Sequence, residues 1–443
     1  MVLGYWAIPG RIGKTILLSI AGMGFIGYHS VATLVFLLCA TLLSYALGKL
    51  IAQRKHSKMW LGIGVGLLLL ALFSTKYLPM FKPALEGILS KLMGGKALEL
   101  RDVIVPLGIS YTVFRLISYL IDVHWKIVKP GSFIDFLCYT TYFPIFFAGP
   151  IERFEAMKPQ LEAAATISNE QVNFGYSRIV FGVFKKYVLV NWLFAAMVSR
   201  AHGGGIVAEA MYVLAYALFI YLDFSAYSDI AIGSSALLGI KIRENFNSPY
   251  AATNITDFWR RWHISLSDWI RDYLFFPLSG LSTKRVWQML FVPLIAMGLC
   301  GIWHGSGWKY LAWGLFHGFL IALYQFKGKS IAKQVFGKNV VARLFANLMF
   351  VGVIVVSWYF FYPPTTEHSL PLETGKINML KLAFLAGCVL LTAWLKGGLL
   401  KLRLPGFVTA LRFNPILMHS VLLVITLVIG MFNSDNTFVY VDF

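Results

Sequence analysis

Residues 288–304 read QMLFVPLIAMGLCGIWH, an apolar run that carries no acidic residue, lysine or arginine and ends on a histidine. A helix needs about 20 mostly apolar residues, with a lower limit of about 17, to cross the hydrocarbon core of a bilayer. The run therefore predicts a membrane-spanning helix. Because an ionisable side chain at membrane depth costs free energy, the terminal histidine needs a structural or a chemical reason to be there.

Runs of the same kind recur along the chain, which has 443 residues, 58% of them hydrophobic and only 13% charged. A soluble domain usually carries about a quarter charged residues. We therefore expect an all-α polytopic membrane protein with roughly ten to twelve transmembrane helices and additional interfacial helices. The apolar runs behind this expectation lie near residues 13–30, 31–49, 59–77, 103–124, 133–149, 180–199, 206–222, 224–240, 288–304, 309–326, 345–362, 377–395 and 416–433.

The formal net charge of +19 does not indicate nucleic-acid binding, because the basic residues cluster between apolar runs, near 49–58, 327–343 and 396–403. This placement follows the positive-inside rule, with those loops cytoplasmic. The four cysteines stand singly within apolar runs, so we expect packing residues and no metal site. No linker or separate soluble domain interrupts the sequence, and we expect one integral membrane domain over residues 1–443.

Two histidine segments carry the strongest chemical signal: His304 in GIWHGSGW (residues 301–308) and His263 in DFWRRWHISLS (residues 257–267). Imidazole suits proton transfer near neutral pH, so a histidine in an apolar site could deprotonate a hydroxyl that then attacks a thioester. The glycines at 301, 305 and 307 would let another backbone or a slender ligand approach closely. A lone buried histidine is more often structural, and the residues alone leave both readings open.

The segment around His263 is expected to form one amphipathic helix that starts near Asn254. On a helical wheel His263 lies at the border of an apolar stripe. A five-residue offset separates two side chains by about 140°, so Asp268 would diverge from His263. This geometry disfavours the His-x4-Asp site of soluble-face glycerolipid acyltransferases. The stripe comprises Phe258, Trp262, Leu266, Trp269 and Tyr273.

Other polar residues interrupt the apolar runs. Asp223 and Asp229 lie in YLDFSAYSD (residues 221–229), and acids in a membrane helix face the bundle interior. They could orient a catalytic histidine or tie helices together, and we favour the structural role. Arg153 follows the irregular AGP of residues 148–150, where its guanidinium could bind a phosphate or an oxyanion, or lie at the cytoplasmic interface.

Longer motifs add a family resemblance. Residues 221–233 (YLDFSAYSDIAIG), 244–250 (ENFNSPY) and 257–273 (DFWRRWHISLSDWIRDY) closely resemble the membrane-bound O-acyltransferase family. Within that family the chain is similar to the branch containing the membrane subunit of bacterial alginate O-acetylation. The resemblance covers a motif-bearing core at about residues 105–320. Motifs of the same branch are PLGIS (106–110), AGPIER (148–153), GIWHG (301–305) and WGLFHG (313–318).

The resemblance implies a helical bundle that encloses a tunnel, with His304 as the catalytic general base and His263 as its companion. It also implies a cytoplasmic acyl thioester donor, above all acetyl-CoA, and no bound cofactor. The acceptor would be an exopolysaccharide or cell-wall polymer, modified with an extracytoplasmic acetyltransferase partner at the bacterial cytoplasmic (inner) membrane, among its lipids. The further candidate substrate-binding residues are Arg153, Trp303, Arg261, Asp223 and His317.

Several alternatives stay open. The same family includes the membrane protein of teichoic-acid D-alanylation, whose donor is a carrier protein, and enzymes that acylate lipids or proteins. A transporter or flippase would favour two similar halves with paired broken helices, and the sequence shows no such repeat. An accessory scaffold would tolerate replacement of its histidines. None of these motifs identifies the acceptor polymer.

Overall fold

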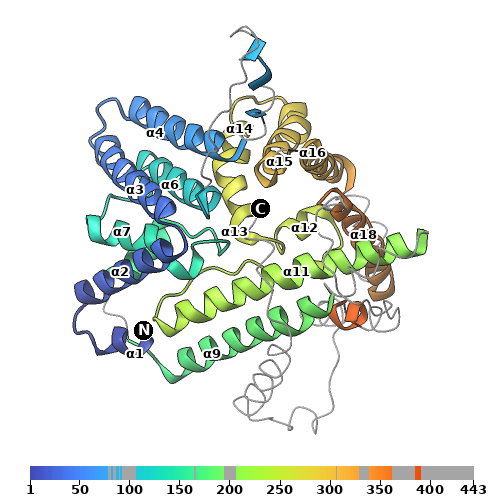
Figure 1. Cartoon of the computed structure of the whole chain (residues 1–443). Helices are drawn as coiled ribbons and strands as arrows, with labels where there is room; N and C mark the ends of the chain where they lie inside the picture. The colour runs from blue at the N-terminus through green and yellow to red at the C-terminus, as the bar shows by residue number, and fades with distance from the viewer. Residues whose placement is uncertain are drawn as a thin grey trace. The chain divides into compact units, whose positions relative to one another are not determined.

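The computed structural model describes residues 1–77, 106–163, 166–193, 206–305, 307–328 and 339–361, with the short pieces 81–82, 86–88, 90–91 and 385–390. All regular secondary structure in these residues is helical (Figure 1). They divide into two compact units: Met1–Val172 with Ser235–Ile242, and Asn173–Ser234 with Arg243–Phe443. The expected all-α fold is confirmed.

The described residues contain five helices that are long and apolar enough to cross a membrane. The chain is therefore a multi-pass membrane protein. The predicted runs at 377–395 and 416–433 lie largely or wholly outside the described residues, so the total of ten to twelve spans stays a prediction. The five spans are Val31–Ala52, Ser57–Tyr77, Glu209–Leu237, Trp287–His304 and Val340–Phe361.

The first unit is built around α6 (Ile109–His124), whose residues are almost all buried. Two long helices, α3 (Val31–Ala52) and α4 (Ser57–Leu72), pack on α6, and α2 (Arg11–His29) packs on α7 (Phe133–Thr141) (Figure 1). The other helical elements of this unit are α1 (Val2–Ala7), η1 (Phe73–Tyr77), η2 (Phe143–Ile145) and α8 (Phe154–Glu162).

Three expected spans differ from the structure. The runs at 206–222 and 224–240 form one continuous helix, α11 (Ile206–Leu237), because the polar residues between them do not break a helix. The run at 133–149 is α-helical only to Thr141 and continues as the short 3-10 helix η2, since Pro144 has no amide hydrogen to continue the α-helical ladder and restricts the residue before it.

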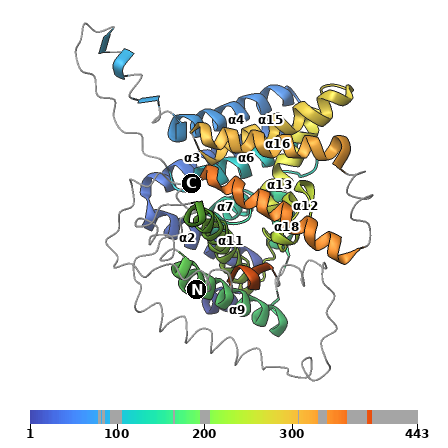
Figure 2. The same ribbon diagram turned by 90° about the vertical axis from the view of Figure 1, so that its right-hand side faces the viewer.

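The second unit places α9 (Asn169–Phe184) and η3 (Lys185–Val190) beside α11. A hairpin of α15 (Val292–His304) and α16 (Trp308–Leu323) lies side by side in both views (Figures 1 and 2). The other helical elements are η5 (Pro249–Ala251), α12 (Ile255–Trp259), α13 (Ile264–Ile270), η6 (Arg271–Phe275), α14 (Phe276–Ser279), η7 (Trp287–Phe291), η8 (Tyr324–Gly328), α18 (Val340–Ser357) and η9 (Trp358–Phe361).

The α15–α16 hairpin explains one of the predicted glycines. A Cβ added at Gly301 would collide with the backbone oxygen of Tyr310 on α16, and one added at Gly314 would collide with that of Met297 on α15. The sequence left open whether a second backbone or a slender ligand lies beside Gly301; the structure places the backbone of α16 there. Because the two helices touch backbone to backbone, a side chain at either glycine would force them apart.

The segment around His263 is not one helix, which corrects the sequence interpretation. Helix α12 ends at Trp259, α13 begins at Ile264, and His263 between them has φ 41° and ψ 55°, in the left-handed region. The physical reason is that backbone groups here bind another loop: Asn247 N donates to Arg261 O at 2.9 Å, and Ile264 N donates to Asn245 O at 3.0 Å. All five residues of the predicted apolar stripe are nevertheless buried.

Candidate active site

His304 is the last residue of α15, where the chain leaves the helix through an extended Gly305. Its side chain is buried, at 6% exposure, among aromatic rings. The ring centroids lie 4.7 Å from Trp303, 5.4 Å from Trp313 and 5.2 Å from Phe361. An imidazole with these walls is held away from bulk water.

His317 also packs against Trp313. Its ring is 4.6 Å from Trp313 and 5.5 Å from Trp259, and its Nε2 lies 3.1 Å from the Ser357 hydroxyl. The side chain is fully buried. The structure thus brings His304 and His317 together around Trp313, as the spacing of their two motifs alone could not show.

His263 packs its ring at right angles to Phe224 of α11, with the centroids 4.6 Å apart. Burial lowers the pKa of its imidazole, so the ring is neutral at pH 7. A series of ring contacts joins Phe224 to Trp313, the tryptophan that both His304 and His317 contact. It runs Phe224–Phe246 (5.0 Å), Phe246–Trp262 (5.2 Å), Trp262–Trp358 (4.8 Å) and Trp358–Trp313 (6.0 Å).

Asp223 has a structural partner that sequence reasoning missed. Its carboxylate lies 2.7 Å from the ammonium of Lys186 in η3, and both side chains are about 2% exposed. The only sequence signal for this pair was a lysine doublet, Lys185 and Lys186, within an apolar run. The pair supports the favoured structural role of Asp223, and a contact with substrate stays a prediction.

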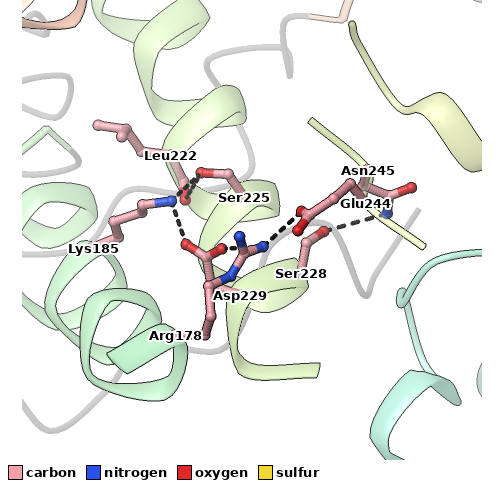
Figure 3. Close-up of polar contacts among 8 residues, drawn as sticks. All are labelled: Arg178, Lys185, Leu222, Ser225, Ser228, Asp229, Glu244 and Asn245. Atoms are coloured by element: carbon pink, nitrogen blue, oxygen red, sulfur yellow. Dashed lines mark hydrogen bonds and ion pairs between the residues drawn. The ribbon is translucent and has the colours of Figure 1, made fainter. Parts of the chain in front are cut away.

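Asp229 lies at the centre of a second polar cluster (Figure 3). Its two oxygens bind Lys185 at 2.5 Å and Arg178 at 2.7 Å, and Arg178 also binds Glu244 at 2.7 Å. Lys185 donates to the Ser225 hydroxyl of α11 at 3.1 Å. Both acids of the 221–229 run therefore tie α11 to the α9–η3 segment.

The two predicted arginines lie in different units. The Arg261 side chain binds Asp257 at 3.0 Å and the backbone oxygen of Asn247 at 3.3 Å, so it braces the turn before His263. Arg153 belongs to the first unit, where it precedes α8 and its backbone amide donates to Glu152 Oε1 at 3.1 Å. Its role beside the histidines stays a prediction.

Asp268, the partner that a glycerolipid-type site would need, binds Arg271 instead, at 2.6 Å. Its side chain is 29% exposed. Among the described residues, no group of three or more histidines, cysteines and acids could hold a metal ion.

The candidate site residues all lie within a stretch that matches a known family. A model described as the membrane-bound O-acyltransferase family matches residues 123–362. The chain is 34% identical over 370 residues to the probable alginate O-acetylase AlgI of Pseudomonas putida, which covers 81% of this chain and 74% of the relative.

Two further relatives act on cell-wall polymers, by their names. The peptidoglycan O-acetyltransferase of Helicobacter pylori is 29% identical over 401 residues, covering 82% of this chain and 73% of the relative. The teichoic acid D-alanyltransferase of Bacillus subtilis is 31% identical over 232 residues, covering 50% of this chain and 59% of the relative.

Proposed function

Because the chain belongs to the membrane-bound O-acyltransferase family and is a multi-pass O-acyltransferase, we propose that it passes acetyl groups from cytoplasmic acetyl-CoA to hydroxyls of an exopolysaccharide or cell-wall polymer. Two relatives named for acetyl transfer support the acetyl group, since each covers about four-fifths of this chain, whereas the named D-alanyltransferase covers half. The proposed location is the bacterial cytoplasmic membrane, with an extracytoplasmic acetyltransferase as partner.

The observation that carries the proposal is the aromatic enclosure of His304 by Trp303, Trp313 and Phe361. As general base, the neutral imidazole takes the proton of the acceptor hydroxyl while the hydroxyl oxygen attacks the thioester carbon. The tetrahedral intermediate collapses, the carbon–sulfur bond breaks, and the imidazolium returns the proton to the leaving thiolate. The apolar walls keep water from competing with the acceptor for the thioester.

The other candidate residues have supporting roles in this proposal. His263 acts as a companion to His304, and Trp303 and His317 help to bind the substrate beside it. Arg153 and Arg261 help to bind the charged parts of the donor or the acceptor, because guanidinium pairs well with phosphate and carboxylate. No bound cofactor is required, since the thioester itself is the activated donor.

A second candidate function is transfer of D-alanine to teichoic acid, with an acylated carrier protein as donor. It is supported by the named D-alanyltransferase relative, which matches over half of the chain. The histidine chemistry is the same in both cases, so the two differ only in donor and acceptor.

The test compares His304→Ala with His56→Asn, an exposed histidine in the first unit whose left-handed backbone asparagine tolerates. Acyl groups released from the cell polymers by mild base are identified by mass spectrometry, with the membrane protein level measured in parallel. We expect His304→Ala to lower polymer acetylation by about 100-fold or more at normal protein level, with His56→Asn unchanged.

Full acetylation in His304→Ala would refute the general-base role. Release of D-alanine in place of acetate would favour the second function.

A further inference from the structure

The first backbone amides of α13 are capped by Asn245, a residue from a different loop. Ile264 N donates to the backbone oxygen of Asn245 at 3.0 Å, and Ser265 N donates to the Asn245 side-chain oxygen, Oδ1, at 3.4 Å. Ser265 Oγ donates to the same Oδ1 at 2.6 Å. The leading amides of a helix usually bind the side chain of the residue just before it, but here that residue is His263, whose side chain makes no capping bond.

In this arrangement the His263 imidazole takes no part in the helix cap. A residue just before a helix normally has an extended backbone and turns its side chain back onto the first amides. Since Asn245 meets those amides, His263 can adopt its left-handed backbone, and its ring packs on Phe224 instead. A left-handed non-glycine residue persists only where its surroundings enforce it.

The same loop also binds the chain before His263, through the bond from Asn247 N to Arg261 O. His263 is therefore held on both sides by one short loop, residues 245–247.

Asn245 is itself fixed to the helix that carries the imidazole's partner. Its side chain is fully buried, and its Nδ2 donates to Ser228 Oγ of α11 at 3.3 Å (Figure 3). Phe224 and Ser228 are four residues apart on α11 and so share one face of that helix. One face of α11 thus contacts both the His263 ring and the side chain that holds the His263 backbone.

We propose that Asn245 is a positioning residue for acyl transfer: it caps α13 so that His263 keeps its left-handed backbone and presents its imidazole to the site. This inference rests on the proposed function, because it requires His263 to take part in the reaction. Asn245 acts through His263 and does not contact the substrate.

The test uses a second buried asparagine, whose side chain donates hydrogen bonds where that of Asn245 accepts them. Asn245 is needed as an acceptor, whereas Asn347, fully buried in the same unit, donates its Nδ2 to Tyr250 O at 2.8 Å and Ala252 O at 2.7 Å. Aspartate keeps the acceptor but removes the donor. At position 245 the Ser228 hydroxyl can then donate to the carboxylate, whereas both partners of Asn347 are carbonyl oxygens that can only accept. Asn245→Asp should therefore rescue Asn245→Ala, while Asn347→Asp should be no better than Asn347→Ala.

Two quantities are measured on full-length protein reconstituted in membranes. The first is kcat for acetyl transfer from radiolabelled acetyl-CoA, and the second is amide hydrogen exchange in the peptide covering residues 264–270. We expect Asn245→Ala to lower kcat by about 10- to 100-fold, because displaced catalytic groups lose rate steeply. Amide hydrogen exchange in residues 264–270 should be faster in Asn245→Ala than in the wild type. Asn245→Asp should restore both kcat and the exchange rate to within about threefold of the wild type.

Unchanged kcat in Asn245→Ala, or loss in Asn245→Asp equal to that in Asn245→Ala, would overturn the proposal. Full activity of His263→Ala would also overturn it. In that last case faster exchange in Asn245→Ala would show that the cap is real and that only the catalytic use of His263 is wrong. The proposed function itself is judged separately, by His304→Ala.

Discussion

Changing Asp223 to asparagine removes the carboxylate that neutralises Lys186 inside the second unit and leaves the shape of the side chain intact. The two charged groups lie 2.7 Å apart and are about 2% exposed. At an effective dielectric constant of about 20, their attraction is roughly 6 kcal/mol. Part of the lost attraction is offset because a neutral amide costs less to desolvate than a carboxylate, so we expect a net destabilisation of about 3–5 kcal/mol.

The matched control is Asp268→Asn. Asp268 pairs with Arg271 at a similar distance, 2.6 Å, but the two side chains are 29% and 51% exposed. An exposed pair of this kind contributes less than about 1 kcal/mol. Tryptophan fluorescence of purified protein in detergent should give a melting temperature lowered by roughly 5–10 °C for Asp223→Asn and by no more than about 2 °C for Asp268→Asn.

A double variant, Lys186→Met with Asp223→Leu, separates structure from substrate binding. Replacing a buried ion pair by apolar side chains of similar size is often neutral, so stability should return to near the wild-type value. If the role of Asp223 is structural, acetyl transfer returns as well. A double variant that is stable but inactive would refute this reasoning and place Asp223 in contact with substrate, as would an Asp223→Asn protein as stable as the wild type.

Two further predictions concern the histidine pockets. Burial holds the pKa of His263 below its unfolded value of about 6.5, so at lower pH protons bind the unfolded chain preferentially and the folded protein loses stability as the pH falls below about 6.5. Melting temperatures measured from pH 7 to pH 5 should therefore fall less steeply in His263→Asn than in the wild type. Equal slopes in the two proteins would contradict this. Trp313→Ala should admit water beside His304 and raise the ratio of free radiolabelled acetate to transferred acetyl by about tenfold. The control Trp308→Ala, at a residue 81% exposed, should leave this ratio unchanged. Equal ratios in the two variants would exclude Trp313 as a barrier to water.

The sequence was sufficient for the class of fold and for the burial of the motif stripe, because both depend on the proportion and period of apolar residues. Phe258, Trp262 and Leu266 are all buried although the helix breaks between the first and the last of them. Helical periodicity indicates which side chains are buried, and it does not indicate which carbonyl each amide binds.

The missed features are contacts over long sequence separations. The break at His263 depends on Asn245, 20 residues upstream of Ser265, and the partner of Asp223 is Lys186, 37 residues away. No local pattern specifies either pairing. The resemblance to a family supplied the proposed roles of His304 and His263, which spacing alone left open. The grouping of His304 with His317 around Trp313 required the structure.

The close contact between α15 and α16 also fixes two of the three aromatic neighbours of His304 relative to each other. Gly301 and Gly314 lock the two helices in register, and Trp303 and Trp313 are both carried by this rigid hairpin. The third wall, Phe361, belongs to the separate element η9 after α18. Phe361 thus couples η9 to the hairpin: its ring packs on Trp313 and Tyr310, and its backbone oxygen accepts a hydrogen bond from Tyr216 of α11. The aromatic enclosure of His304 therefore depends on the hairpin, η9 and α11 together.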